Sequence, residues 1–495
     1  MHNNIMVLGT TSNAGKSFVA AGLCRIFYQD GYRTAPFKSQ NMALNSYITG
    51  DGLEMGRAQA VQAQACGKKP SVFMNPILLK PTSDRGSQVI VNGEIYRDMT
   101  AREYYQNKKA LIPVIKKAYQ VLADENDIVV IEGAGSPAEI NLKQDDIVNL
   151  GMARMVGAPC ILVADIDRGG VFASIYGTIM LLEEQERRYI KGIIINKFRG
   201  DKAILQNGLD MIASLTGVPV LGVLPYADID LEDEDSLSRK LMKKEKSPGL
   251  DIAVIQFPRI SNFTDFDALH ASGQASVRYV RDISELGMPD AVILPGTKST
   301  MHDLLWMRQN GLEAQIKKLR AGGCTILGIC GGYQMLGNVL EYPQGVELGR
   351  TIPGMGLLDC VTVFKNEKIR TQIGGNVCRR TGFLKDLEKV YGYEIHMGQT
   401  FCENPWILLD DGRSDGGVST DGHVIGTYLH GIFDKGDFLR LFLNNLLEKK
   451  GEEGSVQISS YEDYKTLQFE KLEKILRDNV DIKRIYDIIQ GGSID

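Results

Sequence analysis

Gly9-Thr10-Thr11-Ser12-Asn13-Ala14-Gly15-Lys16-Ser17 is the stretch that decides the fold of the first half of this chain. It follows the apolar run Ile5–Leu8, which reads as a short buried strand, and precedes Phe18–Phe27, which has the pattern of an amphipathic helix. A strand, a glycine-containing loop and a helix in this order predict a phosphate-binding loop, in which backbone N–H groups and the helix N-terminus hold the phosphates. The expected nucleotide ligands are Gly9, Thr10, Asn13, Gly15, Lys16 and Ser17, and the last is also a candidate Mg²⁺ ligand.

Further apolar runs alternate with helical patterns as far as residue 226, and a new series of such runs begins near residue 251. The runs are continuous instead of alternating, which is typical of parallel strands covered on both faces. We therefore predict an α/β protein with two doubly wound, mainly parallel sheets. The predicted strands are Ile5–Leu8, Ile128–Ile131, Cys160–Ala164, Gly192–Ile195 and Pro219–Val223, then Asp251–Phe257, Ala291–Pro295, Thr325–Ile329 and Gly422–Tyr428.

The expected domains are residues 1–226, a charged linker over 227–250, a second domain over 251–440 and a helical C-terminal extension over 441–495. The linker is predicted because acidic and then basic residues run together there, which usually marks a solvated connector. A length of 495 residues exceeds what one hydrophobic core organises, so several domains are expected. The best C-terminal helices are expected over Phe438–Lys449 and Tyr461–Asp478.

Polar residues gather where the predicted strands of the first domain end, the edge at which open α/β sheets bind ligands. Glu132 ends one strand before Gly133-Ala134-Gly135 and is a candidate Mg²⁺ ligand, directly or through water. Asp165 and Asp167 are candidates for metal or substrate contact, and Asn196 is a candidate for nucleobase recognition. Basic residues in the same loops suggest an acidic substrate beside the nucleotide: Lys38, Arg57, Lys80, Arg85, Arg168, Lys197 and Arg199.

The second domain contains a nucleophile elbow at Gly328-Ile329-Cys330-Gly331-Gly332, directly after an apolar run. The sharp strand-to-helix turn presents the Cys330 thiol, and the N–H of Gly331 can face a developing oxyanion. Farther along, Gly426–Gly431 offers His430 as a base. This pair of residue types predicts thiolate attack on an acyl carbon.

Composition narrows the class of protein and its compartment. A net charge of −5 gives no general attraction to nucleic acid, and no apolar run approaches the length of a membrane span. The eight cysteines include no C-x-x-C pair, so we expect no zinc site, no dense disulfide framework and mostly reduced thiols. Together with the absence of a basic-then-apolar leader, these features predict a cytoplasmic protein.

These motifs, taken together and in this order, resemble the cobyric acid synthases, glutamine-dependent enzymes of cobalamin biosynthesis. The phosphate loop, with five residues between Gly9 and Gly15, is similar to that of dethiobiotin synthetases and their relatives. The resemblance covers roughly residues 5–435. The other stretches that carry it are Pro36–Ser46, Glu54–Ala60, Glu132–Asn141, Asp165–Phe172, Asn196–Asp201, Pro295–Lys298, Cys330 and Tyr393–Gly398.

The resemblance implies ATP-dependent amidation of four peripheral carboxylates (b, d, e and g) of adenosylcobyrinic acid a,c-diamide to give adenosylcobyric acid. Glutamine would be the nitrogen donor and Mg²⁺ the metal cofactor. The expected partners are therefore the corrinoid and glutamine, with no nucleic acid and no membrane. Self-association into a homo-oligomer is left open.

The resemblance also implies roles for particular residues. In the second domain Cys330 is the glutaminase nucleophile, His430 its base, and Gly296 and Gly331 the oxyanion-hole candidates. In the first domain the implied Mg²⁺ candidates are Ser17, Glu132 and Glu54, and Lys38 and Asn196 join the phosphate loop among the cofactor-binding residues.

At one position the chain departs from the usual catalytic triad of glutaminases, in which a cysteine, a histidine and a carboxylate act together. Glutaminases of this type usually carry Glu two residues after the catalytic His, to orient it, and here that position is Ile432. The cobyric acid synthases and their sister enzymes share this lack, so it leaves the third triad member unassigned. Without an orienting carboxylate we expect weak glutamine hydrolysis until the synthetase site is occupied. His396, within a family stretch, is left with two roles, beside the glutaminase site or beside the corrinoid.

Three alternatives stay open. Cobyrinic acid a,c-diamide synthase shares the architecture and differs in which carboxylates react. An amidotransferase acting on a cell-wall lipid intermediate usually divides these domains between two chains. A partitioning-type regulatory ATPase with an inert thiol domain would carry a second lysine early in the phosphate loop, where this chain has Thr10–Asn13, and would keep working without Cys330.

Overall fold

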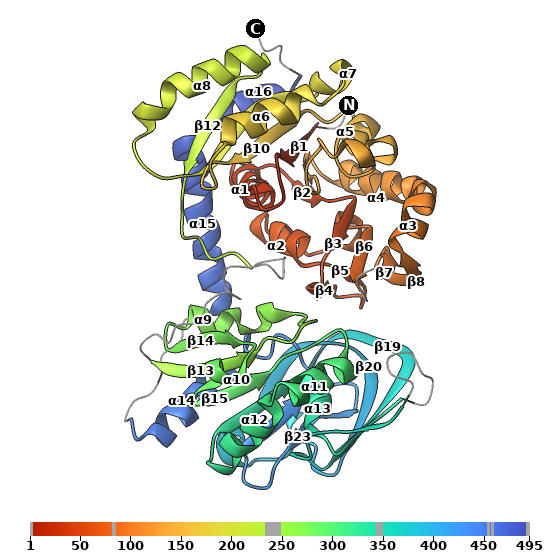
Figure 1. Cartoon of the computed structure of the whole chain (residues 1–495), viewed down its shortest axis with the longest axis vertical. Helices are drawn as coiled ribbons and strands as arrows, with labels where there is room; N and C mark the ends of the chain where they lie inside the picture. Colours follow the sequence, from red (N-terminus) through yellow and green to blue (C-terminus); the bar gives the residue numbers. More distant parts are fainter. Residues whose placement is uncertain are drawn as a thin grey trace. The chain divides into compact units, whose positions relative to one another are not determined.

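The computed structural model of the chain describes residues 3–81, 86–232, 249–342, 350–452, 456 and 460–491. The chain divides into two compact units, each built on its own sheets (Figure 1). The first unit comprises Met1–Ala43, Glu54–Glu232 and Lys465–Asp495, and the second comprises Leu44–Leu53 and Asp233–Tyr464. This division differs from the expected domains at two places, since a short early segment belongs to the second unit and the end of the chain belongs to the first. Most of the expected charged linker, residues 233–248, lies outside the described residues.

A six-stranded parallel sheet forms the centre of the first unit, in the order β12-β11-β10-β1-β9-β2. The five strands predicted here are confirmed, and β2 was not predicted. Because β1 lies in mid-sheet and leads to β2 on one side, while β10 leads to β11 on the other, the loops after β1 and β10 diverge and leave a crevice. The strands are β1 (Asn3–Gly9), β2 (Thr34–Phe37), β9 (Ile128–Glu132), β10 (Cys160–Asp165), β11 (Ile190–Phe198) and β12 (Val220–Pro225).

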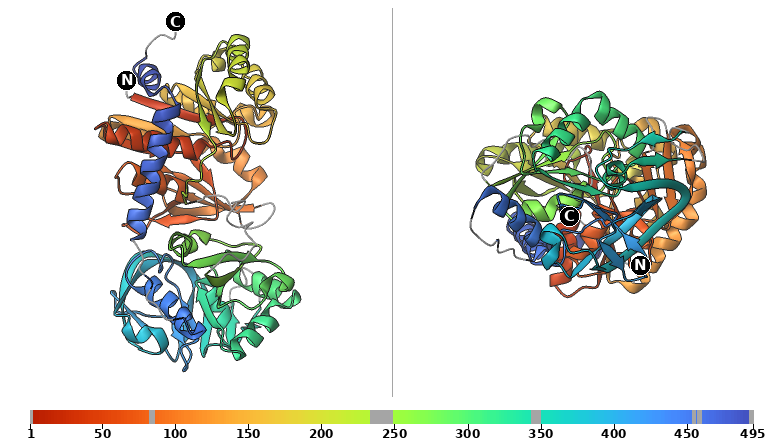
Figure 2. Two further views of the ribbon diagram at one scale, coloured as in Figure 1. Left: turned by 90° about the vertical axis from the view of Figure 1, so that its left-hand side faces the viewer. Right: turned by 90° about the horizontal axis from the view of Figure 1, so that it is seen from below.

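Helices from both ends of the sequence complete the core of this unit. The predicted first helix is confirmed as α1 (Lys16–Gln29), and it shares one apolar cluster with α15 (Tyr461–Asn479) and α16 (Ile482–Ile489). Figure 2 shows α15, in blue, running beside the red N-terminal elements. The packing is close, because a Cβ on Gly22 of α1 would lie 2.7 Å from Leu476 Cδ2 of α15. The expected C-terminal extension is therefore, from residue 465 onward, part of the first unit's core.

A second, four-stranded sheet in the order β3-β6-β7-β8 lies in the first unit and was not predicted. Its last strand leads into a helix that begins with a capping box, in which the Thr100 and Glu103 side chains each bond the other's backbone N–H. A turn of 3-10 helix, η2, then separates this helix from the next. The elements are β3 (Gln40–Met42), β6 (Ile77–Pro81), β7 (Gly86–Val91), β8 (Glu94–Thr100), α3 (Ala101–Asn107), η2 (Lys108–Leu111) and α4 (Ile112–Glu125).

The second unit contains a sheet in the order β14-β13-β15-β16-β24-β23, parallel except for β23. The four strands predicted here are confirmed, with β16 between β15 and β24. Their carboxyl ends therefore lie side by side, which decides where the chemistry can take place. The strands are β13 (Leu250–Ile255), β14 (Ala275–Val280), β15 (Ala291–Leu294), β16 (Thr325–Ile329), β23 (Gly417–Val418) and β24 (Val424–Thr427), and the predicted helix that follows is α14 (Phe438–Lys450).

A long antiparallel pair, β19 (Cys360–Val377) and β20 (Lys389–Cys402), dominates the other sheet of this unit and was not predicted. Cys360 and Cys402 face each other across the pair and are joined as a disulfide, whereas the other six cysteines are free. The expectation of mostly free thiols agrees with this count. No described helix is both long and apolar enough to cross a membrane.

Candidate active sites

The loop between β1 and α1 has the backbone of a phosphate cradle. Asn13 and Gly15 adopt positive φ angles of 59° and 109°. Gly15 is the N-cap residue of α1, and because it has no side chain to accept the first N–H groups of the helix, these groups remain available to a ligand. The buried Lys16 ammonium donates to the carbonyl oxygens of Thr11 (2.9 Å) and Gly135 (3.0 Å). The lysine thus lies back over the loop and links it to the segment after β9.

Glu132 is the centre of a buried polar network beside this loop. Its carboxylate accepts hydrogen bonds from Ser17 Oγ (2.8 Å) and Gln62 Nε2 (2.5 Å) and forms an ion pair with Lys38 Nζ at 3.1 Å. Burial alone would raise the pKa of Glu132, but the charge of Lys38 and these hydrogen bonds lower it overall, so the group stays ionised. A carboxylate next to a hydroxyl is the oxygen donor set that Mg²⁺ prefers, so Ser17 and Glu132 fit the predicted metal site.

Two other predicted residues lie elsewhere. Glu54 is fully buried and forms an ion pair with Lys80 at 2.7 Å, so its carboxylate is already engaged in the first unit. Asn196, expected at a nucleobase, donates from Nδ2 to the Ala14 carbonyl at 3.0 Å. A Cβ on Gly15 would lie 2.0 Å from this amide nitrogen, so the side chain of Asn196 packs directly under the phosphate loop. Its observed role is to brace the loop.

The basic residues expected to attract an acidic substrate are mostly engaged with carboxylates of the chain itself. Besides Lys38 and Lys80, ion pairs join Arg57 to Glu232, Lys197 to Asp165 and Arg199 to Asp167 at 2.5, 2.6 and 3.0 Å. The positive charge of these side chains is therefore largely compensated. Arg85 lies outside the described residues.

The nucleophile elbow is present in the second unit at the end of β16. Cys330 has φ 50° and ψ −108°, a backbone conformation that a residue with a side chain rarely adopts, and α13 (Gly331–Leu336) begins immediately after it. The side chain is 8% exposed, and its Sγ lies 3.6 Å from the Ile395 carbonyl oxygen in β20. The turn therefore holds the thiol in one direction, at the edge where β15 and β24 also end.

His430, which follows β24, is held by a carboxylate that the sequence did not reveal. Its Nδ1 lies 2.6 Å from Asp265 Oδ2, and Asp265 Oδ1 accepts the N–H of Gly431 at 3.0 Å. Burial lowers the pKa of His430, but the charge and hydrogen bond of Asp265, followed by those of Cys330, raise it to about 10. The imidazole is thus protonated near neutral pH and lies within hydrogen-bonding reach of the thiol.

This geometry corrects the expectation of a poorly held imidazole. Asp265 lies in the short 3-10 helix η5 (Phe263–Phe266), far before His430 in sequence, so the position occupied by Ile432 is not needed. In the sequence, Asp265 is distinguished only by the phenylalanines on either side of it, Phe263 and Phe266. An acidic residue among aromatic residues is a weak indication of a catalytic role. The premise for weak basal glutamine hydrolysis is therefore removed.

Both glycines predicted for the oxyanion hole border the same site. A Cβ on Gly296 would lie 2.8 Å from His430 Cε1, and a Cβ on Gly331 would lie 2.8 Å from the Thr297 side chain. The N–H of Gly331 is at the first position of α13, where no carbonyl of the helix can accept it. The structure therefore brings Gly296, Cys330, Gly331 and His430 together from three adjacent strand ends.

Two further contacts hold the imidazole. The Tyr393 ring stacks on it with centroids 5.3 Å apart, and Asn262 Nδ2 lies 3.4 Å from Nε2. Asn262 Oδ1 in turn accepts the backbone N–H of Ser46 at 3.1 Å. Asn262 therefore links the segment Leu44–Leu53 to the catalytic histidine. His396 also lies in this unit, stacked on Tyr428 with centroids 3.7 Å apart.

The two halves of the chain match two known domain families. Residues 5–237 match the CobQ/CobB/MinD/ParA nucleotide binding domain, and residues 251–438 match the CobB/CobQ-like glutamine amidotransferase domain. The phosphate loop lies in the first match, and the cysteine, histidine and aspartate lie in the second. The chain is therefore a glutamine-dependent amidoligase, with a nucleotide-binding unit and a glutaminase unit.

Full-length relatives define the family more closely. The chain is 54% identical to a cobyric acid synthase of Ruminiclostridium cellulolyticum, over 99% of this chain and 98% of the relative. It is 52% identical to that of Lachnoclostridium phytofermentans, over 99% and 100%. The chain belongs to the cobyric acid synthase family. Among solved structures, PurLQS from Thermotoga maritima aligns with 45% of this chain and 97% of its own at 19% identity and a TM-score of 0.31, which is too weak to support an inference.

Proposed function

We propose that this enzyme converts adenosylcobyrinic acid a,c-diamide into adenosylcobyric acid by amidating the b, d, e and g carboxylates with ammonia taken from glutamine. The observation that carries the proposal is the pairing, in one chain of this family, of a Cys330–His430–Asp265 site with a phosphate loop whose Ser17 bonds Glu132. The first site releases ammonia and the second activates a carboxylate.

In the glutaminase site, the Cys330 thiolate attacks the side-chain amide carbon of glutamine. The carbonyl oxygen becomes an oxyanion, for which the N–H groups of Gly331 and Gly296 are the candidate donors. The protonated His430, kept charged by Asp265, gives its proton to the departing nitrogen, and ammonia leaves. Water then attacks the thioester, so glutamate is released and the thiol is regenerated.

In the synthetase site, the phosphate loop and Lys16 bind the nucleotide phosphates, and Ser17 and Glu132 are the residues suited to hold Mg²⁺. The metal would neutralise charge on the phosphates. Transfer of the γ-phosphoryl group to a substrate carboxylate gives an acyl phosphate and ADP. Ammonia attacks that carbonyl and phosphate leaves, so each turnover makes one amide.

The test follows the corrinoid by mass spectrometry in the presence of ATP, Mg²⁺ and glutamine. We expect stepwise replacement of four hydroxyls by amino groups, and the Cys330→Ala protein should achieve the same with ammonium salt but not with glutamine. Cobyrinic acid, offered in parallel, should not be amidated at the a and c positions. No change in the a,c-diamide, with glutamine still hydrolysed, would refute the assignment of substrate.

A further inference from the structure

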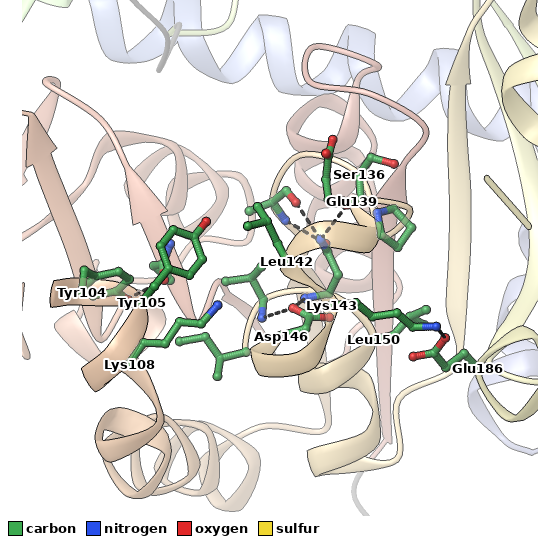
Figure 3. Close-up of a pocket in the computed structure, with 16 residues that line it drawn as sticks. Tyr104, Tyr105, Lys108, Ser136, Glu139, Leu142, Lys143, Asp146, Leu150 and Glu186 are labelled. Carbon is green, nitrogen blue, oxygen red and sulfur yellow. Dashed lines mark hydrogen bonds and ion pairs between the residues drawn. The ribbon is translucent and has the colours of Figure 1, made fainter. Parts of the chain in front are cut away.

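A pocket in the first unit, separate from the phosphate loop but sharing a wall with it, has no role in the chemistry described so far (Figure 3). Its volume is about 100 Å³. Sites that enclose a whole drug-sized ligand span roughly 300–1,000 Å³, so this pocket has room for a side arm of a ligand and not for a large ring system.

Lys108 is the most unusual residue of the pocket. It is 6% exposed, yet no described carboxylate or hydrogen-bond acceptor pairs with its ammonium, which instead lies 4.4 Å from the centroid of the Tyr105 ring. Figure 3 shows Lys108 and Tyr105 reaching into the space from one side, opposite Leu142 and Asp146. Burial lowers the pKa of Lys108, against the attraction of Asp146. A buried ammonium without an anionic partner is costly unless a ligand compensates its charge.

Three of the other charged residues of the pocket, Lys143, Asp146 and Glu186, are already engaged. Lys143 forms an ion pair with Glu186 at 2.6 Å. Asp146 accepts the N–H groups of Val148, Asn149 and Gly151 at 2.8–2.9 Å. Lys108 is therefore the cation of the lining that can pair with an incoming carboxylate, while the acidic groups can still accept amide N–H donors.

The wall shared with the nucleotide site is the segment after β9. Ala134 and Ser136 line the pocket, and the carbonyl of Gly135 between them accepts the Lys16 ammonium. Asn149 holds this segment, since its Nδ2 donates to the carbonyl oxygens of Ala134 (2.7 Å) and Ser136 (3.3 Å). A group seated in the pocket thus lies against Ala134 and Ser136, the two residues that flank the Gly135 carbonyl bonded by the phosphate-loop lysine.

The rim is apolar and open. Tyr105 and Leu142, which line the pocket, are 41% and 38% exposed. Large apolar side chains at this exposure, beside a pocket that contains the unpaired ammonium of Lys108, match a ligand with a flat apolar body and a charged arm.

We propose that this pocket receives one carboxylate arm of the corrinoid, paired with Lys108, while the ring lies on the rim formed by Tyr105 and Leu142. The inference rests on the proposed function and names its substrate-binding site. It also explains how one site can serve several arms in turn, because a short pocket recognises a carboxylate and not the whole molecule.

Equilibrium dialysis with adenosylcobyrinic acid a,c-diamide tests this directly, because the corrinoid is measured by its own absorbance. We expect Lys108→Met to raise the dissociation constant roughly 10- to 100-fold, the range for loss of a charge-assisted hydrogen bond. Lys109→Met is the matched control, since Lys109 is 61% exposed, pairs with Asp145 and does not line the pocket. Glutamine hydrolysis and nucleotide affinity should be unchanged in both variants.

A second pair of variants separates charge from folding. Leu142→Asp places a negative charge on the exposed rim and should weaken corrinoid binding more than Leu142→Asn does. Equal dissociation constants for Lys108→Met and Lys109→Met, or for the two Leu142 variants, would overturn the pocket assignment while the proposed function stands. A wild-type protein that binds no corrinoid would overturn both.

Discussion

Replacing Asp265 by Asn tests the glutaminase site most sharply. Asp265 and Cys330 together raise the pKa of His430 from 6.5 to about 10 in spite of its burial. At roughly 1.36 kcal/mol per pKa unit, the net preference for the protonated imidazole is about 5 kcal/mol. An Asn side chain removes the charge and presents either a donor or a neutral acceptor to Nδ1, so the imidazole loses both its proton and its fixed orientation. Loss of the orienting carboxylate in a comparable triad costs a factor of about 10⁴ in kcat, and we expect about 10³ to 10⁴ here.

The assay compares glutamine hydrolysis with ammonia-dependent amidation in the same preparation. Hydrolysis should fall by that factor, while amidation with ammonium salt should be unchanged, because the synthetase site is intact. Asp437→Asn is the matched control, since Asp437 is an exposed carboxylate of the same unit that pairs with Arg440. Hydrolysis by Asp265→Asn within threefold of the wild type would refute the role of Asp265, provided that the control behaves as expected.

The unfolding free energy should depend on pH, because folding raises the pKa of His430. A histidine whose pKa is raised by folding contributes stability that is fully present below about pH 6.5 and is lost as the pH rises through about 10. The difference in unfolding free energy between the wild type and Asp265→Asn should therefore be larger at about pH 6 than at about pH 10. A difference that grows with pH would contradict the assignment of the proton to His430.

Three further outcomes are expected. Cys330→Ala should abolish glutamine-dependent amidation and leave the ammonia-dependent rate within a factor of about two, and equal loss of both rates would argue against a separate glutaminase site. Gly15→Ala should remove measurable nucleotide binding in a calorimetric titration, because its Cβ would meet Asn196 Nδ2 at 2.0 Å, whereas Gly31→Ala, with a φ of 91° and open space, should cost only backbone strain. Leu476→Ala should lower the unfolding free energy by about 2–5 kcal/mol in a denaturant titration, and a change below about 1 kcal/mol would contradict the packing of α15 on α1.

The sequence revealed the parts of the fold that depend on local patterns. Apart from β2, β14 and β23, the strands of the two main sheets are continuous apolar runs, so periodicity was sufficient to predict them. Cys330 and the phosphate loop are each contained in a few consecutive residues, so spacing was sufficient there. The pair β19 and β20 is different, because its residues alternate poorly between buried and exposed and its ladder joins residues far apart in the chain. Such pairing is decided by tertiary contacts.

The site residues that escaped prediction share one property. Asp265 and Lys108 lie in short 3-10 helices that have no distinctive motif, and each becomes significant only through a neighbour that the fold supplies. Conversely, the basic residues near the strand ends looked like a substrate site until the structure showed their carboxylate partners. Charge near a sheet edge is visible in sequence, but whether that charge is compensated is not.

The division of the chain into five segments has a consequence for attempts to separate the two activities. The backbone passes from one unit to the other four times, at residues 43/44, 53/54, 232/233 and 464/465. A protease site introduced within 233–248 would therefore yield an amino-terminal fragment that still contains Leu44–Leu53 of the glutaminase unit, and a carboxy-terminal fragment that still contains α15 of the other. The nicked enzyme should elute as one species under native conditions. Production of either half alone would leave Asn262 without Ser46 or the first sheet without its last two helices.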